Sequence, residues 1–314
     1  MAAEYASTRS AFIAALIEAG RFNTGIVVVS ADSESRFGGF VKEFPNRSFN
    51  VGIAEQTMVG MAAGLALTGK TPVITAYANF LAFRALEQIR VDIAAEKLDV
   101  KIVGTDTGFS AGWSGYTHLA LEDMAAIRAL PNIVIMDPAD GNEAFHATRA
   151  MFEHRGPVYI RLRGRQGEPA LPVADRPFVI GQGEVLVEGE DVLIVACGAA
   201  VYHSLEAARL LREQGWSPSV VKMSTVRPLD EGLLGELAAR IPKVVTVEEH
   251  SIVGGLGSAV AEFLCERGIG AHLRRLGVVN GFCRPGSEKA LRKALSLDSE
   301  GIASAVSRFL INEK

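Results

Sequence analysis

Short apolar runs alternate with longer amphipathic segments along almost the whole chain. An apolar run such as 26–30 has no polar face, which is typical of a strand buried on both sides of a parallel sheet. A segment such as 7–18 instead places its apolar residues on one stripe, as an amphipathic helix does. Regular alternation of the two predicts an α/β fold with mainly parallel, doubly wound sheets. The predicted strands are 26–30, 47–49, 71–75, 100–105, 133–136, 158–162, 192–197, 218–223, 244–248 and 272–277, and the predicted helices are 7–18, 57–68, 80–96, 121–130, 141–154, 200–214, 229–240, 287–295 and 301–310.

A segment rich in proline and glycine, 164–183, interrupts this alternation and indicates an exposed linker. The chain has 314 residues, a length that suits two domains better than one. We therefore expect a first doubly wound domain over 1–165, a linker over 166–183 and a second α/β domain over 184–314.

Composition excludes several classes of protein. A net charge of −4 and a pI of about 5.9 argue against a surface for nucleic acid or anionic membranes. The three cysteines, Cys197, Cys265 and Cys283, lie far apart without metal-binding spacing, so we expect reduced thiols, no metal ligands in this chain and a cytoplasmic protein. The stretch 1–5 lacks the features of a signal peptide, and no apolar run approaches the length of a membrane span.

Polar residues follow several of the predicted strands directly. They include Asp32, Glu55, the turn 77–79 and the glycine-rich loop 108–118. Ligands of doubly wound sheets bind beyond the carboxyl ends of the strands, so we expect these segments to share one edge. A lone glutamate at a strand–helix junction such as Glu55 more often serves the positive end of a helix dipole than chemistry.

The neighbours of Glu55 change that interpretation. The run Asn50-Val51-Gly52-Ile53-Ala54-Glu55-Gln56, followed by alanines and Gly64, closely resembles the pyrimidine-binding domain of the transketolase family. This wider group includes deoxyxylulose-phosphate synthases and the β subunits of 2-oxo acid dehydrogenases. The resemblance implies that Glu55 contacts the aminopyrimidine ring of thiamine diphosphate and shares a proton with a ring nitrogen, while the cofactor carries the carbanion chemistry.

The resemblance continues through the segment 77–83. A bare Phe-x-x-Phe pair is usually ordinary core, because residues three apart share one helical face. In this family, however, aromatic residues of the segment pack on the pyrimidine. The resemblance therefore implies that Phe83 stacks on the ring, with Phe80 and Tyr77 as pocket walls and with Ile53 and Asp32 also in the cofactor site.

The loop that ends at Thr117-His118 departs from the family pattern. The matching histidine lies over the cofactor and handles the sugar and its proton transfers, which implies the same role for His118. Ser114 stands where the family has an aspartate that reads a donor hydroxyl, and Asp106 stands where a substrate-contacting histidine is common. We therefore expect a donor other than the usual sugar phosphates, for example a bulky or unusual sugar derivative.

Three arginines are candidates for a substrate anion. Arg9 matches a family arginine that holds a substrate phosphate, and Arg161 and Arg163 end the strand before the linker, near another such position. Forked guanidinium groups suit phosphate or sulfonate oxygens, although solvated surface arginines are about as common. The glycine-rich run 254–258 lacks the full dinucleotide spacing, so we expect it to be structural.

The chain covers only two of the three domains of a complete transketolase. The missing domain binds Mg²⁺ and the diphosphate through a Gly-Asp-Gly motif, which does not occur in this sequence. The resemblance therefore implies the C-terminal subunit of a split transketolase, a ketol-transferring enzyme. Its N-terminal partner subunit would supply the Mg²⁺ ligands, and an α2β2 heterotetramer is expected.

Three other functions compete with this one. They are a 2-oxo acid dehydrogenase β subunit, a deoxyxylulose-phosphate synthase-like subunit and a non-catalytic regulatory or scaffold paralogue. The Thr117-His118 loop and the Phe-x-x-Phe segment favour the transketolase side. The intact Glu55 argues against a non-catalytic paralogue, but the change at Trp113-Ser114 keeps it open.

Overall fold

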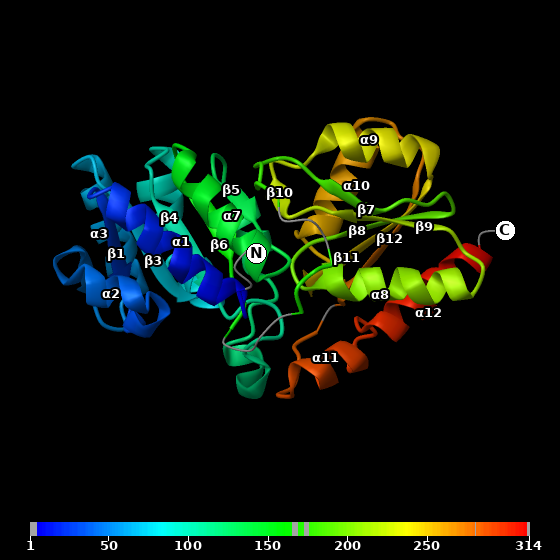
Figure 1. Ribbon diagram of the computed structural model, residues 1–314, viewed down its shortest axis with the longest axis horizontal. Helices are drawn as coiled ribbons and strands as arrows, with labels where there is room; N and C mark the ends of the chain where they lie inside the picture. Colours follow the sequence, from blue (N-terminus) through cyan, green and yellow to red (C-terminus); the bar gives the residue numbers. More distant parts are fainter. Residues whose placement is uncertain (1–4, 165–168, 173–175, 280, 313–314) are drawn as a thin grey trace.

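The computed structural model describes residues 5–164, 169–172, 176–279 and 281–312. These residues form two α/β domains that lie side by side, each a mainly parallel sheet with helices on both faces (Figure 1). The predicted fold class is therefore confirmed. Of the predicted linker, 166–168 and 173–175 lie outside the described residues, as does 1–4 of the stretch considered for a signal peptide, and 169–172 and 176–183 contain no helix or strand.

The first domain is built on a seven-stranded sheet. Its strands are all parallel except β10, which joins one edge antiparallel to β5. Strands β1 and β4 are buried along their whole length, as their apolar runs predicted. In spatial order the strands are β10 (Thr225–Arg227), β5 (Val134–Met136), β6 (Val158–Arg161), β4 (Lys101–Thr105), β3 (Thr71–Tyr77), β1 (Ile26–Ser30) and β2 (Ser48–Asn50).

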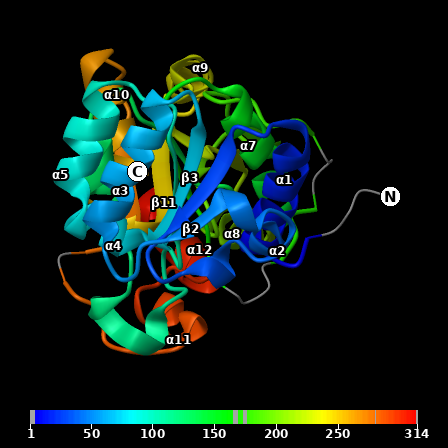
Figure 2. The same cartoon turned by 90° about the vertical axis from the view of Figure 1, so that its left-hand side faces the viewer.

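Helices cover both faces of this sheet (Figure 2). On one face α1 (Thr8–Phe22), α2 (Gly39–Glu43) and α7 (Gly141–Glu153) share a hydrophobic core with the strands. The other face packs against α3 (Glu55–Leu67), α4 (Ala78–Arg84), α5 (Leu86–Gln88), the π-helix η3 (Ile89–Ala95) and α6 (Asp123–Arg128). Three short 3-10 helices, η1 (Glu34–Arg36), η2 (Pro45–Arg47) and η4 (Gly112–Thr117), lie in the connections.

The second domain repeats this plan on a smaller scale. Its five strands are, in spatial order, β12 (His272–Val278), β11 (Lys243–Ser251), β8 (Val192–Ala196), β9 (Pro218–Lys222) and β7 (Glu184–Val187), with only β7 antiparallel. Helices α8 (Ala200–Glu213) and α12 (Ser299–Asn312) lie on one face and α9 (Glu231–Arg240) and α10 (Leu256–Glu266) on the other (Figure 1). Helix α11 (Glu288–Ala294) precedes α12.

The two domains are joined by more than the linker. Strand β10 belongs to the second domain in sequence but pairs with β5 of the first domain. The guanidinium of Arg227 also donates to the carbonyls of Arg128 and Leu130 in the first domain. One hydrophobic core cluster runs from Ile135 in the first domain to Leu193 in the second. The two sheets are therefore held in one relative position.

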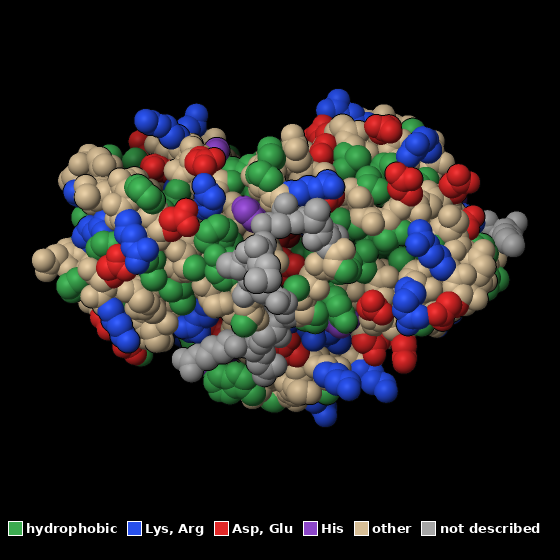
Figure 3. Space-filling model, in the orientation of Figure 1, with side chains coloured by type: hydrophobic (Ala, Val, Ile, Leu, Met, Phe, Trp, Pro, Cys, Tyr) green, Lys and Arg blue, Asp and Glu red, His purple; other side chains and the backbone are tan. Residues whose placement is uncertain are grey.

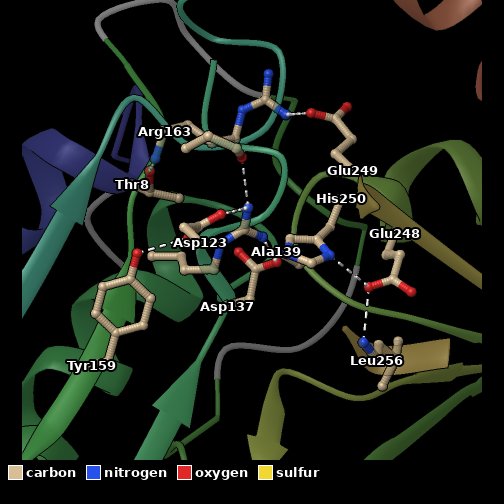
Figure 4. A network of polar contacts seen from close by, with 12 residues as sticks. Thr8, Asp123, Asp137, Ala139, Tyr159, Arg163, Glu248, Glu249, His250 and Leu256 are labelled. Atoms are coloured by element: carbon tan, nitrogen blue, oxygen red, sulfur yellow. Dashed lines mark hydrogen bonds and ion pairs between the residues drawn. The ribbon is translucent and has the colours of Figure 1, made fainter. Parts of the chain in front are cut away.

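A buried ion network lies at this junction (Figure 4). The Arg161 guanidinium, only 2% exposed, donates to Asp123 at 2.9 Å and to Asp137 at 2.7 Å. The Tyr159 hydroxyl donates to Asp123 at 2.7 Å. Nearby, Glu249 of the second domain accepts from Arg163 of the first domain at 3.2 Å. Buried charges are tolerated only when paired in this way, so the network fixes the junction rather than leaving it mobile.

His250 makes a second polar link across the junction. Its Nδ1 donates to the Ser251 carbonyl at 2.7 Å, so Nε2 is left to accept the Ala125 backbone N–H at 3.3 Å. Burial removes the ring from water and lowers its pKa from 6.5 to about 4. Both nitrogens have hydrogen-bonding partners when the ring is neutral, and a proton on Nε2 would abolish the link to Ala125.

We expect the stability of the protein to fall as pH decreases from 6.5 towards 4, partly because of His250. A histidine whose pKa is lower in the folded state contributes stability above its unfolded pKa and loses it as pH falls towards the folded pKa. The full contribution is about 3 kcal/mol. Urea unfolding of His250→Gln between pH 7 and 5 should show a weaker pH dependence than the unsubstituted chain.

The control is His272→Gln, on an exposed position of β12. Glu249 does not interfere in this window. Burial alone disfavours its charge, but Arg163 and Arg292 lower its pKa from 4.5 to about 2, so its contribution is lost only below pH 4.5. An unchanged pH profile in His250→Gln would contradict the assignment.

Candidate active site

Glu55 is the first residue of helix α3, directly after the turn that follows β2. The side chain of Asn50 builds this turn, because its Oδ1 accepts from the N–H of Gly52 at 2.9 Å and of Asp32 at 3.0 Å. Gly52 has a φ of +73°, a conformation that glycine adopts without strain. The turn therefore brings Asp32 and Glu55 to the same edge of the sheet, as the strand ends predicted.

The carboxylate of Glu55 is only 6% exposed. It lies at the positive end of α3, which favours a negative charge there. Arg84, the last residue of α4, donates from Nη1 to Glu55 Oε1 at 3.1 Å. The guanidinium carbon of Arg84 lies 3.6 Å from the ring centroid of Phe80. A carboxylate and an aromatic face thus meet at one point, which suits a flat ring that has a nitrogen to bond to Glu55.

Three predicted site residues form an aromatic cluster beside this point. The rings of Tyr77, Phe80 and His118 lie with centroids 5.0–5.3 Å apart, edge to face. Trp113 approaches His118 at 6.1 Å. Helix α4 and the loop 108–118 are far apart in sequence, and the Asn79 side chain joins them by donating to the Thr117 carbonyl at 2.9 Å.

The hydrogen bonds of His118 determine which ring nitrogen is basic. The Thr117 hydroxyl donates its only proton to the Ser114 carbonyl at 3.0 Å. The same hydroxyl lies 2.9 Å from His118 Nδ1, so Nδ1 must be the donor in that contact. Nε2 then holds the lone pair. His118 is therefore oriented to accept or return a proton through Nε2.

A polar cavity of about 460 Å³ adjoins the aromatic cluster. Arg9 donates to the Ser35 carbonyl at 2.8 Å beside it. Arg36 donates to Asp106 and lies 4.0 Å from the Tyr77 ring centroid. The lining residues are Arg9, Asp32, Ser33, Ser35, Arg36, Tyr77, Asp106, Ser110 and Trp113. Two cations and several hydroxyl and carboxylate groups therefore surround a space the size of a small polar molecule.

Ser110 gives an independent sign that this cavity takes a ligand. Its hydroxyl oxygen is buried and has no hydrogen-bond partner among the residues that the structure describes. A buried polar atom without a partner costs about 1–3 kcal/mol, which a bound polar ligand or water would recover. The cavity therefore joins the predicted substrate residues Arg9 and Asp106 to a hydroxyl that sequence reasoning did not single out.

The structure does not support a substrate role for Arg161 or Arg163. Arg161 is fully enclosed by Asp123 and Asp137, as described above, and does not line the cavity. The guanidinium of Arg163 pairs with Glu249 and Glu288 of the second domain. Both arginines stand at the predicted strand end, but their side chains serve the domain junction instead of the site.

Two predicted cofactor residues lie open to solvent in this chain. Phe83 is 57% exposed and Ile53 is 74% exposed. Large apolar side chains in such positions mark a surface that another molecule covers. Stacking by Phe83 stays a prediction, and the ring that contacts Arg84 in this structure is that of Phe80.

The second domain holds the loop that contains Ser114. The backbone N–H of Gly286 donates to the Gly112 carbonyl at 2.9 Å, and the rings of Tyr116 and Phe282 lie 5.7 Å apart. Trp113 is 71% exposed and Tyr116 is 64% exposed. Figure 3 shows hydrophobic side chains gathered at the lower centre of the molecule, where Figure 1 places η4. The second domain thus positions one wall of the polar cavity.

Sequence reasoning missed Arg36 and Arg84. Arg36 lies four residues after Asp32 in η1, and Arg84 directly follows the Phe-x-x-Phe pair. Proximity to these motifs was the only available signal. In the described part of the chain, no group of three or more His, Cys, Asp or Glu residues is arranged to hold a metal ion. Among the same residues, no helix combines the length and apolarity needed to cross a membrane.

Known proteins match both domains. The chain matches the families described as "Transketolase, pyrimidine binding domain" over residues 4–167 and "Transketolase, C-terminal domain" over residues 181–302. It is 41% identical to the "Putative transketolase C-terminal section" of Methanocaldococcus jannaschii, over 96% of each chain. It is 40% identical to one of the subunits of the apulose-4-phosphate transketolase of Actinobacillus succinogenes, over 91% of this chain and 93% of that one.

A solved structure matches nearly the whole fold. It is described as "Split gene transketolase, inactive beta4 tetramer" and superposes with a TM-score of 0.87 at 42% identity. The match covers 97% of this chain and 98% of that chain. The resemblance first seen in the motifs around Glu55 and His118 therefore extends to both domains.

Replacing Arg161 tests its reassignment to the domain junction. Arg161→Ala leaves the carboxylates of Asp123 and Asp137 buried without their cation, so the free energy of unfolding should fall by about 3–5 kcal/mol. Urea and thermal unfolding measure the loss. Arg209→Ala is the control, because Arg209 makes only exposed ion pairs on α8 and should change stability by about 0.5 kcal/mol or less. Equal stabilities of the two variants would contradict the structural role.

Proposed function

Because this chain belongs to the transketolase family, we propose that it is the C-terminal subunit of a two-chain, thiamine diphosphate-dependent transketolase. In this proposal the enzyme transfers a two-carbon ketol unit from a ketose to an aldose. One observation carries the proposal. The buried carboxylate of Glu55 opens onto the aromatic cluster of Phe80, Tyr77 and His118, next to a polar cavity of about 460 Å³.

Each residue of this arrangement has a proposed task. The cofactor, when bound, supplies the nucleophilic carbon and the sink for the electrons of the broken carbon–carbon bond. Glu55 shares a proton with a nitrogen of its aminopyrimidine ring, and Phe80 and Tyr77 wall the ring. His118 takes or returns a substrate hydroxyl proton at Nε2, the nitrogen that its contact with Thr117 leaves basic.

The polar cavity is the proposed substrate site. Arg9 and Arg36 give it two guanidinium groups, which suit a phosphate or another anionic end of a sugar. Asp106 and Ser110 offer an acceptor and a hydroxyl for sugar hydroxyls. The exposed ring of Trp113 forms an apolar wall. A relative with a similar chain is described as acting on apulose 4-phosphate, and we extend to this chain only the class of an anionic, non-standard sugar.

A partner chain completes the proposed enzyme. The described residues offer no metal-binding cluster, so Mg²⁺ and the diphosphate need ligands from an N-terminal subunit. The exposed Phe83 and Ile53 lie beside the cofactor residues and offer that subunit an apolar surface. An α2β2 heterotetramer remains the proposed assembly. The related split-gene protein is described as inactive when its β chains form a tetramer, which agrees with a need for a partner.

Reconstitution tests the proposal. The chain is mixed with its N-terminal partner, thiamine diphosphate and Mg²⁺, and ketol transfer is assayed with a panel of ketose donors. The mixture should be active and each chain alone inactive. Glu55→Gln keeps the size of the side chain but removes the acid, so kcat should fall about 10²–10⁴-fold.

Glu87→Gln is the matched control, because Glu87 pairs with Arg90 on the exposed surface. Activity of this chain alone would refute the two-chain enzyme. A fully active Glu55→Gln mixture would refute the role of Glu55, and a properly assembled but inactive mixture would favour a regulatory paralogue.

Position 114 is expected to set the donor preference. Ser114→Asp restores the carboxylate that the family uses to read a donor hydroxyl, so kcat/KM for ordinary ketose phosphates should rise relative to other donors by about tenfold or more. Ser114→Asn has nearly the same size without the charge and serves as the control. An unchanged ranking of donors in Ser114→Asp would remove Ser114 from the substrate site.

A further inference from the structure

Arg84 makes two contacts that together define a seat for a flat ring. Its guanidinium donates to Glu55 Oε1 at 3.1 Å, and its guanidinium carbon lies 3.6 Å from the Phe80 ring centroid. A guanidinium is planar and delocalised, stacks on aromatic faces and donates N–H bonds to carboxylates. An aminopyrimidine is also a flat, delocalised ring whose nitrogen can bond to a carboxyl group.

We propose that Arg84 occupies the seat of the cofactor's aminopyrimidine in the free chain and must leave before the cofactor binds. The inference rests on the proposed function, because it assumes that Glu55 and Phe80 bind that ring. It adds a residue that blocks the site when the cofactor is absent. Arg84 is thus a competitor for Glu55 and Phe80 instead of a contact of the bound cofactor.

The free chain has a physical reason to keep this contact. Glu55 is only 6% exposed, and an unpaired carboxylate in such a position is costly. Arg84 supplies a counter-charge. It also covers the face of Phe80, which would otherwise be an exposed apolar surface beside the exposed Phe83.

The contact is also easy to break. The side chain of Arg84 is 47% exposed, and ion pairs of such arginines contribute little to stability. Its backbone stays in place, because Gln56 donates from Nε2 to the Arg84 carbonyl at 2.9 Å. Helix α4 ends at Arg84, so the side chain can turn towards solvent without displacing a following helical turn. Only the guanidinium has to move.

Binding of a neutral ring to the isolated chain tests the inference. The probe is 4-amino-2-methylpyrimidine, which carries no diphosphate and therefore needs neither Mg²⁺ nor the partner subunit. Arg84→Gln should bind this probe about three- to tenfold more tightly than the unsubstituted chain, as measured by NMR titration. Because the probe is neutral, a simple loss of charge repulsion cannot produce the gain.

Two further variants make the result specific. Arg90→Gln, which removes an exposed arginine paired with Glu87, should leave the affinity unchanged. The double variant Arg84→Gln with Glu55→Gln should lose the gain, because the ring then lacks its carboxylate. Circular dichroism and thermal unfolding establish that each variant is folded.

Three outcomes would overturn the inference. They are equal affinity of Arg84→Gln and the unsubstituted chain, weaker binding by Arg84→Gln, and no binding of the probe by either. Weaker binding would make Arg84 a cofactor contact. If Glu55→Gln still abolishes ketol transfer in the two-chain assay, the proposed function survives any of these results. A fully active Glu55→Gln mixture would instead remove the proposed function itself.

Discussion

The burial of one positive charge, that of Arg161, determines how the carboxyl edge of the first sheet is built. A guanidinium removed from water needs opposite charge, which Asp123 and Asp137 supply from two different segments. Asp137 in turn receives the second domain. The Gly198 N–H donates to its carbonyl at 3.0 Å, and a side chain at Gly198 would collide with its carboxylate. The same ion pair therefore orders the edge that carries the site and fixes the position of the neighbouring domain.

The fold was largely predictable because parallel strands buried on both faces leave continuous apolar runs in the sequence. The two antiparallel edge strands, β7 and β10, were not predicted. They are short and incompletely buried, and β10 exists only because another domain offers it a partner. The predicted helix 80–96 is interrupted at Ala85 and continues as a π-helix. Its apolar periodicity was helical throughout, so only the packing against the core reveals the break.

The candidate site was predictable only in part. Glu55, His118 and their aromatic neighbours lie in motifs at strand ends, and the structure brings their segments to one edge. Arg161 was assigned to the substrate because the strand end is known from sequence while the direction of the side chain is not. Arg36 was missed for a related reason. It reaches the cavity from a 3-10 turn whose path depends on tertiary contacts with Thr105 and Asp106.

Strand β10 has a consequence for how such chains change in evolution. The open edge of β5 would be a template for pairing with other chains, and here a segment of the second domain covers it. A gene rearrangement that exchanged the second domain for another would also remove this strand and leave the edge bare. The two domains are therefore inherited as one unit.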